Sequence, residues 1–450
     1  MPVNMQNSPL KIAIVGSGIS GLAAAHALNG SADITLFEAG SYFGGHTHTV
    51  DITLPTAKGA VTHGVDTGFL VFNERTYPNL IKLFADLDVV TAKSDMSFSV
   101  QVPQNKGNLE WSGSNLSTVF AQRSNLLNPR FWRMLRDLMR FNKLATSIAK
   151  SGVDEQLMQP LEEFLLANNF STEFRDWYLL PMLGCIWSCP TAQMLQFPVA
   201  TMVRFCHNHG LLQVNDRPQW WTVTGGAKHY VDKIVANITD KRLDTPVHCI
   251  TRDSRGAHIV TSAGTERFDK VIIATHSDQA LAMLQQPSHV EKRTLSAINY
   301  QANTAILHTD ASVLPQRKAA WAAWNYERVQ CAPGQSNDTS DSANVCLHYL
   351  INKLQPIPFE QPVVVSLNPI KPIAAEHVLG QFDYAHPVFD LAAIKAQASI
   401  PALQGQQNTY FCGAWTGYGF HEDGLKSGLA AAKQLLADSL LADTQWQAAA

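Results

Sequence analysis

Residues 11–28 read KIAIVGSGISGLAAAHAL, and this stretch decides the fold of the chain. A short β-rich run ends at Gly16, the spacing Gly-x-Gly-x-x-Gly follows, and an alanine-rich, helix-forming stretch comes next. Glycines at these positions permit a tight turn, close approach of the backbone to a pyrophosphate, and close packing of helix on strand. The sequence therefore predicts a dinucleotide site in which Gly16, Gly18, Gly21 and, at the helix N-terminus, Ser20 surround the phosphates.

A second strand supplies a carboxylate to this unit. Residues 33–37 read DITLF, a β-rich run that ends at Glu38. Glu38 lies 20 residues after Gly18, at the distance where an acid accepts hydrogen bonds from ribose hydroxyls. Strand, glycines, helix, strand and acid stand in the order of a βαβ dinucleotide-binding unit. We therefore expect an α/β fold with a Rossmann-like, three-layer domain and a parallel sheet.

The residues after Glu38 carry a resemblance to flavin enzymes. Gly44-Gly45 resembles the glycine doublet that follows the ribose-binding acid in flavin amine oxidases and carotenoid-type desaturases, where the chain passes close to the diphosphate and the flavin. A basic residue normally follows the doublet in those families. This chain has His46 there, so the charge at that point depends on pH. The resemblance implies that the dinucleotide is FAD, and we expect it to be held non-covalently.

Three further segments, 68–78, 217–221 and 417–424, resemble a bacterial family of predicted NAD/FAD-binding proteins within the flavin amine oxidase superfamily. The resemblance runs from about Leu10 to Ala437 and implies an FAD-dependent oxidoreductase, with the substrate left open. It also implies cofactor contacts beyond the first 46 residues. These are Asp66, Thr67 and Gly68, Val247 against the adenine, Gly413 and Trp415 in a late loop, and Asp423, Gly424 and Leu425 at a late helix N-terminus.

The late loop also supplies our candidate catalytic residues, Tyr418 and His421. The histidine is a candidate for proton transfer, and the alternative is that it fixes the loop by hydrogen bonds. The tyrosine is a candidate for lining the cavity in front of the flavin. Relatives carry an acid after the glycine that corresponds to Gly413. This chain has Ala414, so backbone or water must make that contact.

The glycine motifs divide the chain into alternating segments. Residues 8–75, 221–296 and 405–440 form the predicted FAD-binding domain. Residues 76–220, where helical patterns dominate, and residues 297–404, where apolar and polar residues alternate, form the predicted α+β substrate domain. We expect strands of this second insertion to form one wall of the substrate cavity.

The composition excludes several classes of protein. There are 34 basic and 37 acidic residues, and the net charge of −3 argues against a nucleic-acid partner. Seven scattered cysteines without CxxC spacing predict reduced thiols in a cytoplasmic protein. The N-terminus does not resemble a signal peptide, and no apolar run is long enough for a membrane span. His207-x-His209 has no acidic companion and the wrong spacing for one helical face, so we expect no metal site.

Residues 129–145 predict a basic amphipathic helix, and Asn128-Pro129 is a typical helix start. At about 100° per residue, the apolar side chains share one face and the basic side chains the other. The helix either lies on an anionic membrane and collects a lipid, or packs on the domain with its basic face in water. The protein would then be cytoplasmic, either free or peripheral on the inner membrane face. The basic side chains are Arg133, Arg136, Arg140 and Lys143.

Three functions remain open at this stage. In the first, the enzyme transfers a hydride from a substrate C–H to flavin N5 and so oxidises or desaturates an apolar, lipid-like molecule. In the second it is an amine oxidase, a class that commonly uses a lysine near the flavin, and Lys228 and Lys353 are the candidates. In the third it is a non-catalytic flavin- and lipid-binding partner protein, which would lack a cavity at the flavin's re face. The electron acceptor and the oligomeric state do not follow from the sequence.

Overall fold

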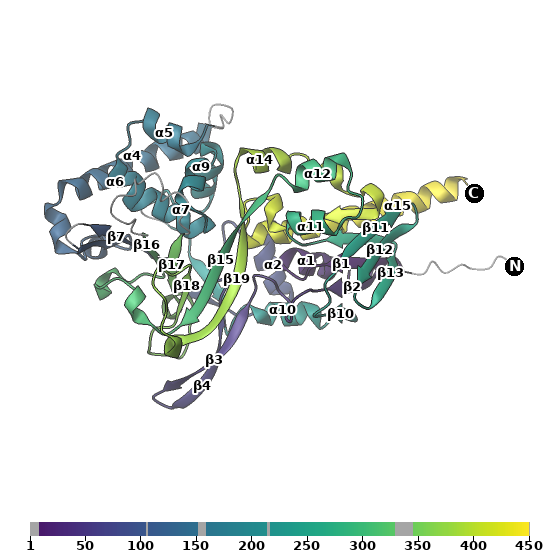
Figure 1. Ribbon diagram of the computed structural model, residues 1–450, viewed down its shortest axis with the longest axis horizontal. Helices are drawn as coiled ribbons and strands as arrows, with labels where there is room; N and C mark the ends of the chain where they lie inside the picture. The colour runs from purple at the N-terminus through teal and green to yellow at the C-terminus, as the bar shows by residue number, and fades with distance from the viewer. Residues whose placement is uncertain (1–8, 105–106, 152–158, 214–216, 329–344, 450) are drawn as a thin grey trace.

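The computed structural model describes residues 9–104, 107–151, 159–213, 217–328 and 345–449, with the side chains of 442–449 left aside. The described chain forms two lobes, and the long strands β15 and β19 run between them (Figure 1). The boundaries proposed above remain our working division of the chain.

A five-stranded parallel sheet is the centre of the first lobe. The strands that flank its first βα turn have the predicted bounds, and their burial on both faces is typical of a parallel sheet covered on both sides. This confirms the predicted fold class. In spatial order the strands are β10 (Asp240–Arg242), β2 (Asp33–Phe37), β1 (Lys11–Val15), β14 (Lys270–Ile273) and β20 (Thr409–Phe411).

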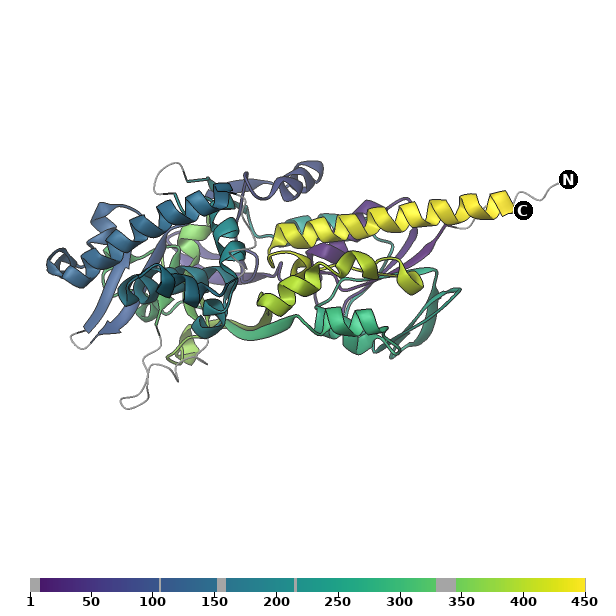
Figure 2. The same ribbon diagram turned by 90° about the horizontal axis from the view of Figure 1, so that it is seen from above.

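Helices cover one face of this sheet and a small antiparallel sheet covers the other. Helix α1 (Ile19–Leu28) packs against the long helix α15 (His421–Ala449), which runs along this lobe in Figure 2. The predicted helix start near Gly424 was therefore a few residues late. Helix α10 (Lys228–Val235) also contacts α1. The antiparallel sheet contains β11 (Cys249–Asp253), β12 (Gly256–Thr261) and β13 (Gly264–Phe268).

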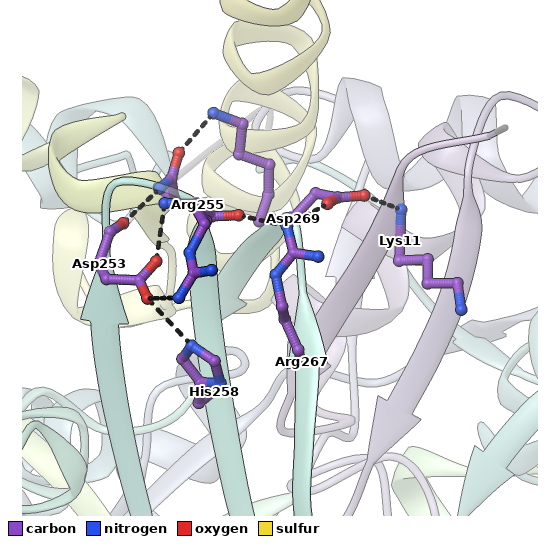
Figure 3. Close-up of polar contacts among 8 residues, drawn as sticks. Lys11, Asp253, Arg255, His258, Arg267 and Asp269 are labelled. Carbon is purple, nitrogen blue, oxygen red and sulfur yellow. Dashed lines mark hydrogen bonds and ion pairs between the residues drawn. The ribbon is translucent and has the colours of Figure 1, made fainter. Parts of the chain in front are cut away.

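Charged side chains join this antiparallel sheet to the start of β1 (Figure 3). Asp269 accepts a hydrogen bond from the backbone N–H of Lys11 at 2.9 Å and pairs with Arg267 at 3.4 Å. Asp253 pairs with His258 at 3.3 Å and with Arg255 at 3.7 Å. Exposed ion pairs of this kind contribute little to stability, because water and salt screen them. We interpret them as contacts that fix the register of the turns.

The second lobe contains a seven-stranded mixed sheet under a layer of helices. Its strands are β19 (Val378–Val388), β15 (Asn299–His308), β18 (Val364–Leu367), β17 (Cys346–Leu350), β16 (Trp324–Glu327), β7 (Phe98–Gln104) and β8 (Gly107–Ser112), in spatial order. The helices include α4 (Pro129–Ser151), α5 (Leu161–Ala167), α6 (Thr172–Phe174), α7 (Leu180–Trp187), α8 (Thr191–Leu195) and α9 (Val199–Asn208).

Two smaller sheets complete the described strands. The ribbon of β3 (Thr49–Thr56) and β4 (Gly59–Asp66) projects from the molecule (Figure 1). Strands β5 (Phe72–Asn73), β9 (Trp220–Val223) and β6 (Thr91–Ser94) form the other small sheet. Within the described residues, no helix has both the length and the apolar character that crossing a membrane requires. The remaining α-helices are α2 (Pro78–Asp86), α3 (Leu116–Val119), α11 (Ser277–Met283), α12 (His289–Leu295), α13 (Ile351–Leu354) and α14 (Leu391–Gln397).

Candidate functional site

A cavity of about 800 Å³ extends from the glycine-rich turn after β1 to the helices of the second lobe. Its volume lies within the range of ~300–1,000 Å³ that is usual for ligand pockets. Twelve of the predicted site residues line it, and they come from all three predicted FAD-binding segments. They are Gly16, Gly18, Ser20, Glu38, Gly44, Gly45, His46, Gly68, Val247, Gly413, Trp415 and His421.

The three glycines of the first turn have different physical tasks. Gly16 has φ +100°, and a Cβ there would lie 2.9 Å from the carbonyl oxygen of Ala274. A Cβ on Gly21 would lie 1.9 Å from the carbonyl oxygen of Gly16. Gly18, in contrast, has open space where a Cβ would be, and no described side chain caps the helix that begins after it. The turn therefore leaves a cradle at the positive end of α1, which fits a pyrophosphate.

The second glycine pair lies directly on this turn. Gly44 has φ +124° and forms a parallel β-bridge with Gly18, while a Cβ on Gly45 would lie 3.2 Å from the Cα of Gly18. Glu38 fixes the same turn, because its Oε2 accepts hydrogen bonds from the backbone N–H of Ser17 at 2.9 Å and from the Ser17 hydroxyl at 2.5 Å. Ser17 was missed from the sequence, since it occupies a variable position of the glycine motif. These residues fit the diphosphate and ribose of FAD.

Four histidines surround the middle of the cavity. The His46 ring lies 5.3 Å from the ring of His386 and 6.4 Å from that of His276, and its buried Nε2 has no hydrogen-bond partner among the described residues. Burial lowers the pKa of His46 well below its usual value, and lowers those of His386 to about 4 and His421 to about 3. These imidazoles are neutral at pH 7. His46 therefore lines the cavity without a charge, and its charge does not change near neutral pH.

His421 is held by hydrogen bonds within the protein. Its Nε2 lies 2.7 Å from the hydroxyl of Tyr230 and 3.2 Å from that of Thr47, and its ring stacks on Phe69 at 3.8 Å. This geometry favours the loop-fixing alternative over proton transfer. Tyr418 is not among the described lining residues. Phe420 lines the cavity in its place and stacks on Phe205 at 4.7 Å.

The other predicted site residues lie behind the cavity wall. Asp66 accepts hydrogen bonds from the Thr49 hydroxyl at 2.5 Å, the Ala227 N–H at 2.9 Å and the Gln355 amide at 2.6 Å, and burial raises its pKa to about 7. It thereby positions the chain at Gly68, which passes so close to His46 that a Cβ on Gly68 would lie 2.2 Å from the His46 carbonyl oxygen. Thr67 supports the same segment. Its hydroxyl lies 2.7 Å from that of Tyr384.

The predicted residues around the start of α15 serve packing and loop geometry. Asp423 Oδ2 accepts hydrogen bonds from the backbone N–H groups of Tyr418 at 3.1 Å and Phe420 at 3.0 Å. A Cβ on Gly424 would lie 2.7 Å from the Ile19 side chain, so this glycine lets α15 approach α1. Leu425 is buried in the core. Cys412 is also buried, which raises the pKa of its thiol to about 12.

The far end of the cavity is apolar. Trp324 and Tyr349 line it from the seven-stranded sheet, which agrees with our expectation that this insertion forms a wall. Sequence alternation groups such residues on one face of a strand but does not say which face meets the flavin. Among the described lining residues, Glu38 is the sole Lys, Arg, Asp or Glu. The other lining residues of this end include Met96, Ile186, Phe205, Leu211, Trp220 and Phe420.

Fold and cavity together define an FAD-dependent oxidoreductase. The chain matches the family model of the flavin containing amine oxidoreductases over residues 19–361, and it belongs to that family. None of the curated protein sequences compared with it matches significantly.

Solved structures share the fold over most of the chain. A fatty acid isomerase from P. acnes that produces CLA is 16% identical, with a TM-score of 0.64, over 94% of this chain and 98% of that chain. Putrescine oxidase bound to putrescine is 15% identical, with a TM-score of 0.65, over 95% and 99% of the two chains. Cyclohexylamine oxidase from Brevibacterium oxydans is 16% identical, with a TM-score of 0.64, over 96% and 99%. At these identities the likeness shows the fold alone.

Proposed function

We propose that this oxidoreductase removes a hydride from a C–H bond of an apolar, lipid-like substrate and so oxidises or desaturates it. The supporting observation is the uncharged far end of the cavity. Aromatic and aliphatic side chains dominate the wall there, and Glu38 lies at the opposite, ribose end. An ammonium group would find no carboxylate partner among the described lining residues, whereas an alkyl chain would bury its surface.

The residues of the chain position the reactants and exclude water. Bound FAD supplies the hydride acceptor. The cradle at Gly18 and the N-terminus of α1 hold the diphosphate end, and the doublet at Gly44 holds the chain close to it. At the centre, the uncharged imidazoles of His46 and His386 line the cavity. Apolar side chains then exclude water from the reacting carbon.

Amine oxidation is the alternative that the family favours, but neither lysine candidate reaches the cavity. Lys228 bonds Asp51 at 2.6 Å and Lys353 bonds Asp95 at 3.2 Å, both near the surface. A non-catalytic partner protein would lack a cavity in front of the flavin. The continuous cavity beyond Gly68 and His46 speaks against that reading.

Anaerobic mixing distinguishes these functions. We expect unsaturated or branched fatty-acyl lipids to bleach the visible absorption of the bound flavin, because their chains fit the apolar wall. Aliphatic amines should leave the spectrum unchanged at the same concentrations. Bleaching by amines and not by lipids would establish the amine oxidase alternative, and bleaching by neither would favour the partner protein.

We further propose that residues 129–145 of α4 contact an anionic membrane. The inner face of α4 is buried at Phe131, Met134 and Phe141, as the apolar pattern predicted. Trp132 is 49% exposed, and Leu127, just before the helix, is 90% exposed. The arginines pair with two buried carboxylates. Arg130 lies 2.7 Å and Arg133 3.5 Å from Glu173, and Arg140 lies 2.7 Å and Arg136 3.7 Å from Asp137, yet all four arginine side chains are 45–69% exposed.

These pairings determine how the membrane proposal is tested. Reversing the charge of Arg140 would remove the arginine that lies 2.7 Å from the buried Asp137 and destabilise the fold. Leu127→Glu combined with Lys143→Glu instead changes exposed groups outside these pairs, and we expect it to weaken co-flotation with phosphatidylglycerol liposomes at least tenfold. Val90→Glu is the control, since Val90 is 69% exposed and lies outside α4. Equal flotation of parent and double variant would show that α4 packs as an ordinary surface helix.

A further inference from the structure

The face of the seven-stranded sheet that points away from the cavity carries polar side chains. On β16, Trp324 lines the cavity. Glu327 comes three residues later, and because side chains alternate along a strand, it points to the opposite face. On β17, Tyr349 lines the cavity, and Cys346 and His348 share the opposite face. The antiparallel register sets Glu327 directly opposite Cys346. Two adjacent strands therefore bring a carboxylate, a thiol and an imidazole to one point.

The three side chains lie close enough for one atom of each to bind the same metal ion. Nε2 of His348 lies 3.1 Å from Oε2 of Glu327 and 3.4 Å from Sγ of Cys346, and the three ligand atoms lie within 4.8 Å of one another. Cys346 and His348 are fully buried, while the Glu327 side chain is 19% exposed. Sulfur, imidazole nitrogen and carboxylate oxygen are the ligands that Zn²⁺ takes in proteins, usually in tetrahedral geometry.

A second layer of hydrogen bonds orients the imidazole. Nδ1 of His348 lies 2.7 Å from the Ser366 hydroxyl, which also lies 2.7 Å from Nε2 of His308. The serine oxygen has two lone pairs, so it can accept from both imidazoles. With its proton on Nδ1, His348 presents the lone pair of Nε2 to a metal, and this support is usual for histidine ligands. Without a metal, the same Nε2 donates to Glu327.

We propose that Glu327, Cys346 and His348 bind one Zn²⁺ ion on this face, with water as the fourth ligand. Binding forms one bond from the metal to each ligand atom and releases the thiol proton of Cys346 to solvent. The partly exposed Glu327 gives the ion a path from solvent. The metal would connect β16 and β17 behind the wall that carries Trp324 and Tyr349. The ligands lie on two strands 19 residues apart in sequence, which is why no ligand spacing indicated a metal.

The test uses untagged, FAD-loaded protein purified from zinc-supplemented cells and passed through gel filtration. We expect close to one zinc ion per chain by elemental analysis. Cys346→Val keeps an apolar core residue, and Glu327→Gln keeps the size and a hydrogen bond. Both should weaken zinc binding at least ~100-fold in competition with a chromogenic chelator, and Ser366→Ala should weaken it 10–100-fold. The flavin content of every variant should match that of the parent.

Two controls make the result decisive. Cys249→Ser changes a half-buried thiol in the other lobe and should retain full zinc. Reloading the chelated parent with Co²⁺ should give absorption bands of a tetrahedral thiolate complex at longer wavelength than the flavin bands, and Cys346→Val should lack them. The proposal is overturned if the parent is zinc-free and titration with micromolar Zn²⁺ shows no binding, or if Glu327→Gln and Cys346→Val bind zinc as the parent does.

Discussion

Gly18→Ala is expected to give a folded protein that purifies without its yellow colour. Apart from its two chain neighbours, no atom of the described residues lies within 4 Å of the position of the new Cβ, and the backbone at Gly18, with φ −61° and ψ 175°, suits alanine. Loss of the glycine N-cap costs about 1 kcal/mol or less. The new methyl group occupies the cradle where the pyrophosphate approaches the backbone, so we expect FAD affinity to fall on the order of 100-fold, about 2.7 kcal/mol. The measurements are the flavin-to-protein absorbance ratio after desalting and the Kd of added FAD.

Two other glycines separate cofactor binding from folding. Gly113→Ala places a methyl group 3.7 Å from the ring of Trp111, an ordinary contact, and it should retain the flavin. Gly21→Ala places one 1.9 Å from the carbonyl oxygen of Gly16, so its unfolding temperature should fall whether or not FAD is added. Gly18→Ala should keep the unfolding temperature of the apoprotein. A yellow Gly18→Ala protein with the parental Kd would disprove the assignment of this cradle.

The first βαβ unit could be predicted in full because its determinants are local. The strands at residues 11–15 and 33–37 and the glycine turn follow from a short stretch of sequence, and the structure has them at those positions. The start of α15 could not be predicted in the same way. Glu422 accepts hydrogen bonds from the backbone N–H groups of Asn79 at 3.1 Å and Leu80 at 3.0 Å, so its carboxylate caps a different helix, α2. Such a tertiary contact leaves no mark in the local sequence.

The substrate lobe shows the same limit more strongly. The amphipathic pattern of α4 predicted its buried face correctly at Phe131 and Met134. It did not reveal the two buried acids, Glu173 and Asp137, that pair with its arginines.

The role of Asp66 could not be predicted either. It was assigned to the cofactor because it directly precedes Thr67 and Gly68, near the resembling segment. The structure gives its carboxylate three protein donors and places it behind the wall.

We expect the free energy of unfolding to fall steeply as the pH is lowered from 6.5 towards 4.5. Burial lowers the pKa of five histidines that line the cavity: that of His46 falls well below its usual value, that of His276 falls below it, those of His209 and His386 fall to about 4, and that of His421 to about 3. In the unfolded chain each histidine takes up its proton near pH 6.5. Between these limits the unfolded chain binds more protons, so acid favours unfolding by about 1.4 kcal/mol per pH unit for each histidine.

Two buried carboxyl groups act in the opposite direction. Burial raises the pKa of Asp66 to about 7 and that of Asp423 to about 6, so in this window the folded protein holds protons there that the unfolded chain does not. Acidification through the window stabilises the fold at these two sites. The five histidines outnumber the two carboxyl groups, so unfolding takes up protons on balance in this window. The expected loss of stability is therefore on the order of a few kcal/mol per pH unit.

Urea unfolding followed by tryptophan fluorescence at pH 7.5, 6.0 and 5.0, with excess FAD present, measures this slope. His386→Gln removes one of these five histidines while retaining an acceptor for the Asn303 amide, which lies 2.9 Å from Nδ1 of His386. It should reduce the slope by about 1.4 kcal/mol per pH unit. His289→Gln is the matched control, because that side chain is exposed in the folded protein as in the unfolded chain, and its slope should equal the parent's. A parental slope near zero, or an unchanged slope in His386→Gln, would mean that the cavity histidines carry protons in the folded protein, and the neutral wall on which the apolar substrate proposal depends would be lost.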